Sequence, residues 1–346
     1  MKKLEVTEFF NTSFIEFAGY DCYRNITSVV DGFKLSQRKV MFTVDKLNIT
    51  SDVKVEQLAP KTAELTEYLH GSQSLFGVIT GIAAPWGIWN NLPLLAAEGN
   101  FGKRLNTTPS APRYIYTYKK EIFDFIFRKE DKIILNQLNF EGNDIEYNHY
   151  LPIVPYAFFK ICDGVGTGFS HLIMPRNPKE VIENVLLMLD GKSPNSLLPY
   201  SEGFNGTIER GATPNSYVYK GTIERISPTK INVIELPISY DLAKYTSVLN
   251  ELEDKNIIAG FKDISDTKQD KFLFEVKVSK EFSSMSDDKI LETLKLVERF
   301  TDNLTMLGED NKIIQFNNDV EIFEYWFKYR LKKYEERRNA YSNLLS

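Results

Sequence analysis

Hydrophobic periodicity changes along the chain at about residue 200. Before that point, apolar residues recur at helical spacing, which predicts helices at 5–24, 34–47, 53–69, 73–84 and 178–189. After it, short alternating runs bounded by turn residues predict strands at 206–210, 216–220, 221–226, 230–236 and 271–278. Helices at 242–255 and 287–299 and a hairpin around 308–312 complete this part. The pattern therefore predicts an α+β fold.

A repeated pentapeptide and a long C-terminal helix are two further features of this region. The pentapeptide Gly-Thr-Ile-Glu-Arg occurs at 206 and again at 221, which we interpret as two similar edge strands and not as a repeat architecture. A last helix is predicted from Val320 to Leu345, with an apolar stripe of Phe323, Phe327, Leu331 and Tyr334. Such a stripe indicates packing on another helix, as in a coiled coil.

Composition narrows the functional classes. The 346 residues suggest two or three domains, and 42% hydrophobic residues are enough for real cores. No apolar run approaches the ~18 residues of a membrane span, so we expect no membrane partner. Two cysteines indicate a reducing compartment without disulfides. With three histidines and no cysteine pairs, we expect no metal site in this chain.

Positive charge is clustered although the net charge is −5. Lys34, Arg38 and Lys39 lie near the start of the second predicted helix. Charges on a helix usually face solvent, but cations at a helix N-terminus oppose its dipole. A polyanionic partner would explain their position, and both interpretations stay open at this point.

Arg113 and Tyr114 are the candidate chemical pair. An arginine fork can hold a phosphate through two parallel bonds, and a neighbouring tyrosine could attack it to form a covalent ester. Tyr114, Tyr116 and Tyr118 also alternate as the residues on one face of a strand would. Taken alone, such a stripe is more often packing than chemistry.

Three other segments of the chain are candidates for function, and two of them also have a plain structural interpretation. The two helices that meet at His70-Gly71 resemble a helix-turn-helix, in which His70 donates to a phosphate or is an ordinary turn residue. Residues 85–112 form a long loop that includes Trp89, and this length favours function. The glycine-rich run 163–168 matches no P-loop. The apolar residues that follow at 171–175 are either core or a wedge between base steps.

Five ordered motifs resemble those of the breakage-and-reunion subunit of type IIA DNA topoisomerases. The resemblance is closest to the medium subunit of T-even phages and to the eukaryotic cleavage core. The motifs are Asp31-Gly-Phe-Lys-Leu-Ser-Gln-Arg38, Tyr68-Leu-His-Gly71, Glu98-Gly-Asn-Phe-Gly102, Ala111-Pro-Arg-Tyr-Ile-Tyr-Thr117, and Leu151-Pro through Gly168 with Ile173-Met-Pro175.

The resemblance implies a role for each matched residue. Tyr114 would be the nucleophile that holds a 5′ phosphate, and Arg113 would lie on the scissile phosphate. A close guanidinium stabilises phenolate and phosphoryl charge. Ile173 would be the wedge that bends the duplex. The DNA-contacting residues would be Arg24, Lys34, Arg38, Lys39, His70, Lys103 and Arg104.

The resemblance also implies domains and partners. We expect a winged-helix domain at 1–150, a tower-like α+β domain at 151–315 and the start of a coiled-coil gate at 316–346. The gate helix either continues beyond this sequence or the protein lacks the usual lower gate. Mg²⁺ and ATP would be bound by a partner subunit or region. Two copies of the chain would act on double-stranded DNA within a larger complex, in the cytoplasm (of a host if the protein is viral) or at the nucleoid.

Departures from the family motifs keep another function open. Leu69 stands where a histidine is expected, Leu35 and Thr27 replace prolines, and Lys39 replaces an arginine. The alternative is a winged-helix protein that binds and bends DNA without cutting it. The retained Arg113-Tyr114 pair favours cleavage, and we expect His70 and Arg113 to carry more of the phosphate contacts. A structural domain without a DNA role would leave the five motifs unexplained.

Overall fold

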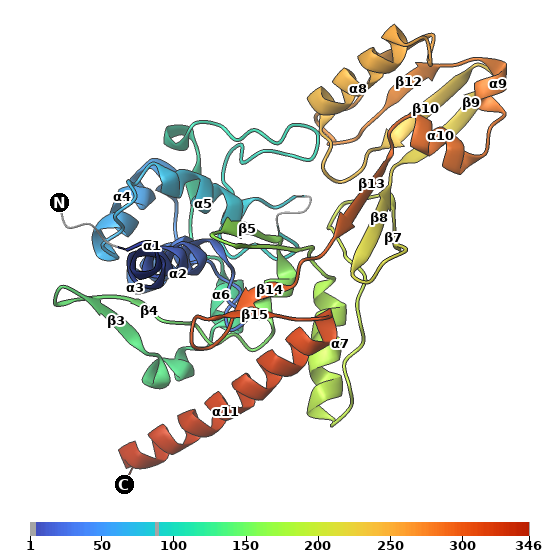
Figure 1. Cartoon of the computed structure of the whole chain (residues 1–346). Coiled ribbons are helices and arrows are strands. Elements are labelled where there is room, and N and C mark those ends of the chain that lie inside the picture. The colour runs from blue at the N-terminus through green and yellow to red at the C-terminus, as the bar shows by residue number, and fades with distance from the viewer. Residues whose placement is uncertain (1–4, 87–89, 346) are drawn as a thin grey trace.

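The computed structural model describes residues 5–86 and 90–345, so Trp89 lies outside the described residues. A main body is formed largely by residues up to 200 (Figure 1). A smaller β-rich part lies at its upper right, and a long C-terminal helix runs along the lower side. The predicted α+β class is confirmed. No described helix is both long enough and apolar enough to cross a membrane.

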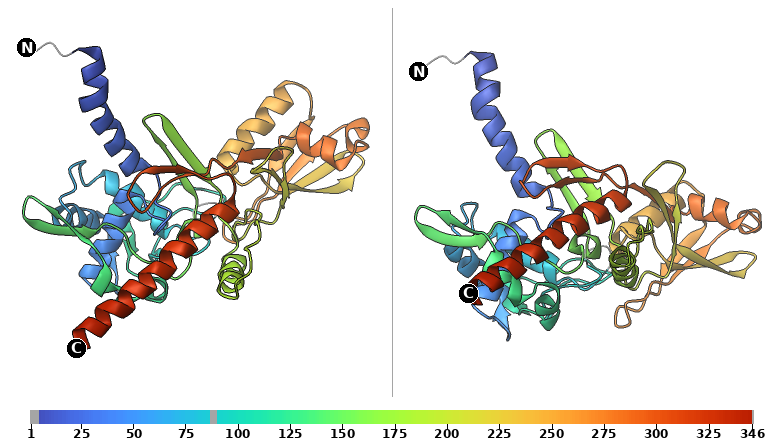
Figure 2. Two further views of the ribbon diagram at one scale, coloured as in Figure 1. Left: turned by 60° about the horizontal axis from the view of Figure 1, so that its bottom comes forward. Right: turned by 90° about the horizontal axis from the view of Figure 1, so that it is seen from below.

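The N-terminal helix is a rod that projects from the body (Figure 2). It consists of α1 (Val6–Phe9), a π-helical turn η1 (Phe10–Phe14) and α2 (Ile15–Asn25). The predicted helix is confirmed, but its apolar residues do not form a core face. Phe9, Phe10 and Phe17 are largely exposed, and only the C-terminal end of α2 packs into the body.

Three helices form the first half of the body: α3 (Leu35–Lys46), α4 (Val55–Leu65) and α5 (Ser74–Ala83). They pack on one another through the apolar stripes that the sequence predicted, including Val40, Val44 and Ile79. Pro60 lies inside α4. A short antiparallel ladder of β1 (Val53–Lys54) with β2 (Tyr116–Thr117) connects these helices to the segment that carries Tyr114.

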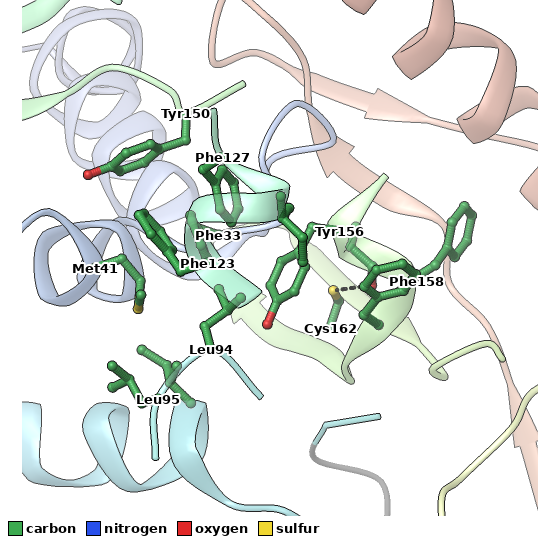
Figure 3. Close-up of a cluster of buried hydrophobic side chains, with 14 of the residues drawn as sticks. Phe33, Met41, Leu94, Leu95, Phe123, Phe127, Tyr150, Tyr156, Phe158 and Cys162 are labelled. Atoms are coloured by element: carbon green, nitrogen blue, oxygen red, sulfur yellow. Dashed lines mark hydrogen bonds between the residues drawn. The ribbon is translucent and has the colours of Figure 1, made fainter. Parts of the chain in front are cut away.

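An aromatic core fills the centre of the body. Phe33, Phe123, Phe127, Tyr150 and Tyr156 make stacked and edge-to-face contacts with one another (Figure 3). The surrounding elements are η2 (Pro112–Tyr114), α6 (Glu121–Ile126), η3 (Lys129–Ile134), η4 (Tyr156–Phe159), α7 (Pro178–Leu189), hairpin β3 (Gln137–Phe140)–β4 (Asn143–Tyr147) and hairpin β5 (Cys162–Gly166)–β6 (Phe169–Ile173). The bounds of α7 confirm the prediction.

The smaller part contains two antiparallel sheets with separate edges. A three-stranded sheet has the order β13-β8-β7, and a four-stranded sheet has the order β11-β12-β10-β9. Both copies of Gly-Thr-Ile-Glu-Arg lie on edge strands, as predicted. The elements are β7 (Thr207–Arg210), β8 (Ser216–Lys220), β9 (Thr222–Ser227), β10 (Lys230–Glu235), α8 (Leu242–Asp254), β11 (Gly260–Asp263), β12 (Phe274–Lys277), α9 (Lys280–Ser283), α10 (Asp287–Thr293) and β13 (Val297–Thr301).

The helix predicted at 287–299 is wrong in its second half. The helix α10 ends at Thr293, and Lys295 has a positive φ of 58°. The next residues, Val297–Thr301, pair with β8 as strand β13. Pairing across a sheet requires a partner that helical periodicity does not reveal, so tertiary structure overrides the local pattern here.

The chain returns to the body through β14 (Thr305–Leu307) and β15 (Ile313–Gln315), the predicted hairpin. It ends in α11 (Asp319–Leu345), which confirms the predicted long helix. Part of the predicted stripe packs within the chain, because Phe323 lies in the main core and Phe327 packs against it. Trp326, which is not in that stripe, is also a core residue. Arg330 of α11 pairs with buried Asp131 of η3 at 2.5 Å. Leu331 and the last turns remain exposed.

Candidate functional site

Arg113 and Tyr114 lie on a tight, anchored turn. Pro112 opens η2, and the Tyr114 amide donates to the Ala111 carbonyl at 2.9 Å. The next residue, Ile115, is fully buried and its carbonyl accepts from the Val55 amide. Tyr114 is 66% exposed, and the Arg113 guanidinium lies 5.2 Å from its ring centroid. The turn thus presents a phenol and a cation together on a fixed backbone.

The three tyrosines of the stripe differ in exposure. Ile115 and Thr117 point inward and are fully buried, whereas Tyr114 lies on the outer side and is not packed. Packing stays the prediction for Tyr116, which is 36% exposed, and for half-buried Tyr118. The Tyr116 backbone pairs with Glu98 in both directions, at 2.9 and 3.0 Å. This bridge holds the loop of the third motif against the turn.

A second group forms around His70. The Tyr20 hydroxyl and His70 Nε2 lie 3.2 Å apart, and the Arg24 guanidinium is 5.8 Å from the Tyr20 ring centroid. Slight burial, and then the Arg24 charge, lower the pKa of His70 below 6.5. Among the described residues, no hydrogen bond or ion pair joins this group to Arg113 or Tyr114. The described side chains therefore form two separate groups, one at Tyr114 and one at His70.

Lys34 and Arg24 line one cavity of about 320 Å³. Lys34 directly precedes α3, and its Nζ lies 3.9 Å from Asp163 Oδ1. Burial lowers the pKa of Lys34, while the Asp163 charge opposes that change. Lys34 has the partly open position that contact with an anion requires.

The predictions for Arg38 and Lys39 as DNA contacts are wrong. Arg38 is 1% exposed and makes two bonds to Asp31, Nε to Oδ2 at 2.7 Å and a second guanidinium N–H to Oδ1 at 3.0 Å. Lys39 Nζ donates to Glu146 at 2.7 Å and to the Thr66 carbonyl at 2.6 Å. Both cations lie inside the body because each has a buried carboxylate partner, which offsets its desolvation.

Arg104 is also misassigned as a DNA contact. Its guanidinium donates to the carbonyls of Leu236 and Pro237 at 2.9 and 2.8 Å and is buried. The Asp270 carboxylate accepts from the backbone amides of Arg104 and Leu105. Arg104 thus connects the long loop to the four-stranded sheet. Its neighbour Lys103 is exposed and remains available.

Ile173 cannot be a wedge in this fold, because it is fully buried at the end of β6. The exposed apolar residue of this hairpin is Val165, which is 76% exposed near the tip of β5–β6 and was not singled out from the sequence. The two flanking glycines pack directly on α2. A Cβ at Gly164 would lie 2.2 Å from the Asn25 carbonyl oxygen, and one at Gly166 would lie 2.9 Å from Cys22 Sγ. A single apolar residue between two glycines was the signal available in the sequence.

No cluster of three or more His, Cys, Asp or Glu side chains that could hold a metal ion occurs among residues 5–86 and 90–345. These residues do not fit an Mg²⁺ centre, so we derive no catalytic step from a metal held by this chain. The described side chains offer an exposed phenol, cations and an exposed apolar hairpin tip.

Comparisons with known proteins define the class. The family model for the A subunit of DNA gyrase/topoisomerase IV matches residues 24–345. DNA topoisomerase 2 of Invertebrate iridescent virus 6 is 32% identical, covering 97% of this chain and 30% of that protein. The mitochondrial DNA topoisomerase 2 of Dictyostelium discoideum is 31% identical, covering 98% of this chain and 26% of that protein.

A solved structure agrees. The crystal structure of the Plasmodium falciparum topoisomerase II DNA-binding, cleavage and re-ligation domain has a TM-score of 0.91 and 30% identity, covering 97% of this chain and 46% of that one. Fold and sequence together define a type IIA topoisomerase cleavage core. The chain belongs to the family of the DNA gyrase/topoisomerase IV A subunit, whose members use Mg²⁺ and ATP. It spans about a quarter to a third of the length of these curated relatives.

Proposed function

We propose that this chain is the DNA-cleavage subunit of an ATP-dependent type II DNA topoisomerase. It makes a transient double-strand break, with a 5′-phosphotyrosyl link on each strand, through which another duplex passes. The observation that carries this proposal is the exposed Tyr114 on an anchored turn beside Arg113, in a chain that matches the family from residue 24 to 345.

The covalent step exchanges one phosphodiester for another. The Tyr114 phenol oxygen attacks the phosphorus and loses its proton, and the bond from phosphorus to the 3′ oxygen breaks. The 3′ oxygen leaves as a hydroxyl, while the 5′ phosphate stays esterified to Tyr114. The reverse attack by the 3′ hydroxyl reseals the strand. Arg113 stabilises the negative charge that develops on the phosphoryl oxygens.

The remaining exposed or half-buried cations bind the DNA backbone in this proposal. Arg24, Lys34, His70 and Lys103 are accessible, whereas the buried cations discussed above are not. Val165 replaces Ile173 as the residue inserted between base steps, because an apolar side chain must be exposed to unstack bases. The hairpin tip provides such a side chain.

The domain scheme extends this proposal to the assembly. Residues 1–150 form the winged-helix domain, supported by the packing of α3, α4 and α5 with the β1–β2 ladder. Residues 151–315 form the tower-like domain and 316–346 the start of the gate. Two chains act with an ATPase and metal-binding subunit or region, in the cytoplasm of a host if the protein is viral, or at the nucleoid.

The second candidate is a protein that binds and bends DNA without cutting it. One observation favours it: the His70 group has no hydrogen bond or ion pair to Arg113 or Tyr114 among the described residues. Leu69, which stands at a motif histidine position, is 71% exposed and adds no phosphate donor.

The deciding experiment measures protein-linked DNA. The chain is mixed with its ATPase and metal-binding partner, Mg²⁺ and supercoiled plasmid, and the reaction is quenched with detergent. We expect protein-linked linear DNA from the natural sequence and none from Tyr114→Phe. Tyr116→Phe is the matched control, because this tyrosine is also exposed and lies two residues away. DNA binding without any linkage would favour the second candidate.

A further inference from the structure

Lys160 is exceptional among the buried cations. Seven lysine and arginine residues are buried in the described part of the chain, and six of them form ion pairs at 3.4 Å or less, namely Arg38, Lys39, Arg104, Lys119, Arg176 and Arg330. Lys160 is 4% exposed and forms no ion pair with residues 5–86 or 90–345; within these ranges its Nζ donates only to the Cys162 thiol, at 3.8 Å. A buried charge without a counter-ion is costly, so this side chain points to an anion that binds there.

A cavity lies where such an anion would bind. Lys160 lines the same space of about 320 Å³ as Arg24 and Lys34. The first residues of α3, Leu35 to Gln37, also line it. The N-terminus of a twelve-residue helix contributes free amide groups and the positive end of its dipole. Helix ends of this kind bind phosphate and other anions.

Positive charge exceeds negative charge around this cavity. The three cations come from α2, from the start of α3 and from the segment before β5, and Asp163 is the one carboxylate among the residues that line it. Asp163 reaches Lys34 only at 3.9 Å, and its side chain is 59% exposed. Burial, and then the charges of Lys34 and Lys160, lower the pKa of nearby His171 to about 3, so that His171 is neutral. The excess of charge is therefore carried by the two lysines and the arginine.

We propose that Lys160, with Lys34 and Arg24, forms a phosphate-binding site at the N-terminus of α3. This inference rests on the proposed function, because the phosphate it takes is a backbone phosphodiester of the bound duplex. A free phosphate has the same chemistry and would use the same donors. Arg24 also contacts Tyr20 of the His70 group, so the site is continuous with the proposed DNA path.

The stability of the free protein gives a first test. Lys160→Met removes an uncompensated buried charge, so its thermal midpoint should equal or exceed that of the natural sequence. Lys39→Met is the matched control, because it leaves Glu146 buried without its partner, and its midpoint should fall. A clear fall for Lys160→Met would show that Lys160 is structural and would overturn the proposal.

The second test measures DNA affinity without cleavage. In a Tyr114→Phe background without divalent metal, fluorescence anisotropy with a duplex of about 30 base pairs gives log affinity against log salt between about 50 and 200 mM. Lys160→Met loses one phosphate contact, so the magnitude of its slope should be smaller by about 0.9. Between the two salt concentrations, the factor by which its affinity falls should therefore be about threefold smaller than for the parent. Lys262→Met, an exposed lysine on β11, should leave the slope unchanged.

A third arm separates the two sources of phosphate. Inorganic phosphate is compared with chloride at equal ionic strength, and the thermal midpoint is measured. If phosphate raises the thermal midpoint of the natural sequence but not that of Lys160→Met, and the salt slope of DNA affinity is unchanged in Lys160→Met, the site is supported and its ligand is a free anion. If phosphate has no effect and the salt slope is unchanged, the site is overturned. The affinity and phosphate measurements do not require strand cleavage, so a changed salt slope without a phosphotyrosyl link would contradict only the proposed function.

Discussion

Arg38 should behave as a structural residue although it lies in a cluster of DNA-binding candidates. Its guanidinium makes two bonds to Asp31, and Asp31 also accepts from the amides of Phe33 and Tyr150, each at 3.0 Å. Arg38→Met keeps most of the side-chain volume but leaves a fully buried carboxylate without a counter-charge. Breaking a buried pair in this way costs about 3–5 kcal/mol, which is a large fraction of a typical folding free energy of about 5–15 kcal/mol.

The assay is denaturant unfolding of Arg38→Met, of Asp31→Asn and of the double variant. We expect the double variant to be more stable than Arg38→Met, because the uncompensated charge is gone. Lys34→Met is the control, since its side chain is partly exposed and its ion pair is long; it should weaken DNA binding with little effect on unfolding. If Arg38→Met unfolds at the natural midpoint and its DNA salt slope falls by about 0.9, Arg38 contacts DNA and is not a structural residue.

The pH dependence of stability provides an independent check on the same pair. Burial alone would raise the pKa of Asp31, but the Arg38 charge and its hydrogen bonds lower it below 3.8. A carboxylate with a depressed folded pKa stabilises the protein above its unfolded value, and this contribution is lost as the pH falls through the folded value. Stability should therefore decrease below about pH 3.8 in the natural sequence, and Asp31→Asn should lack that component.

Two further predictions concern the hairpin and the histidine. Ile173→Ala should lower the free energy of unfolding by about 2–5 kcal/mol. Val165→Ala should change it by less than about 0.5 kcal/mol but should reduce duplex bending, measured by energy transfer between labels at the duplex ends. The reverse pattern would restore Ile173 as the wedge. Arg24→Gln should raise the pKa of His70 toward 6.5, followed by NMR titration, because a nearby positive charge is removed; an unchanged titration would show that the two side chains do not interact.

Helical elements could be predicted from the sequence because their periodicity records burial directly. Part of each apolar stripe of α3, α7 and α11 lies in the core, including Val44, Val185 and Phe323, whereas Leu186, Leu189 and Leu331 are exposed. The predicted ends of these helices differ from the observed ones by at most one residue. The two hairpins β3–β4 and β5–β6 were not predicted as strands. Their runs are short and rich in glycine or polar residues, so alternation gives little signal.

The site could be predicted only where function requires exposure. Tyr114, Arg113 and His70 are exposed on turns, so a motif is enough to find them, although their roles remain proposals. Arg38, Lys39 and Arg104 could not be assigned in the same way, because local sequence does not name a distant partner. Glu146 lies 107 residues after Lys39, and the carbonyls that bind Arg104 come 132 to 136 residues later. Domain boundaries at 150 and 315 stay predictions.

The contact of the β5–β6 hairpin with α2 has a mechanical consequence. Backbone lies on backbone at Gly164 and Gly166, with no long side chain between the strand and the helix that could deform. A force that a stiff duplex exerts on Val165 would therefore move the hairpin and α2 together as one rigid unit. Arg24, at the end of α2, would move with them, so its position would depend on whether the bound duplex is straight or bent.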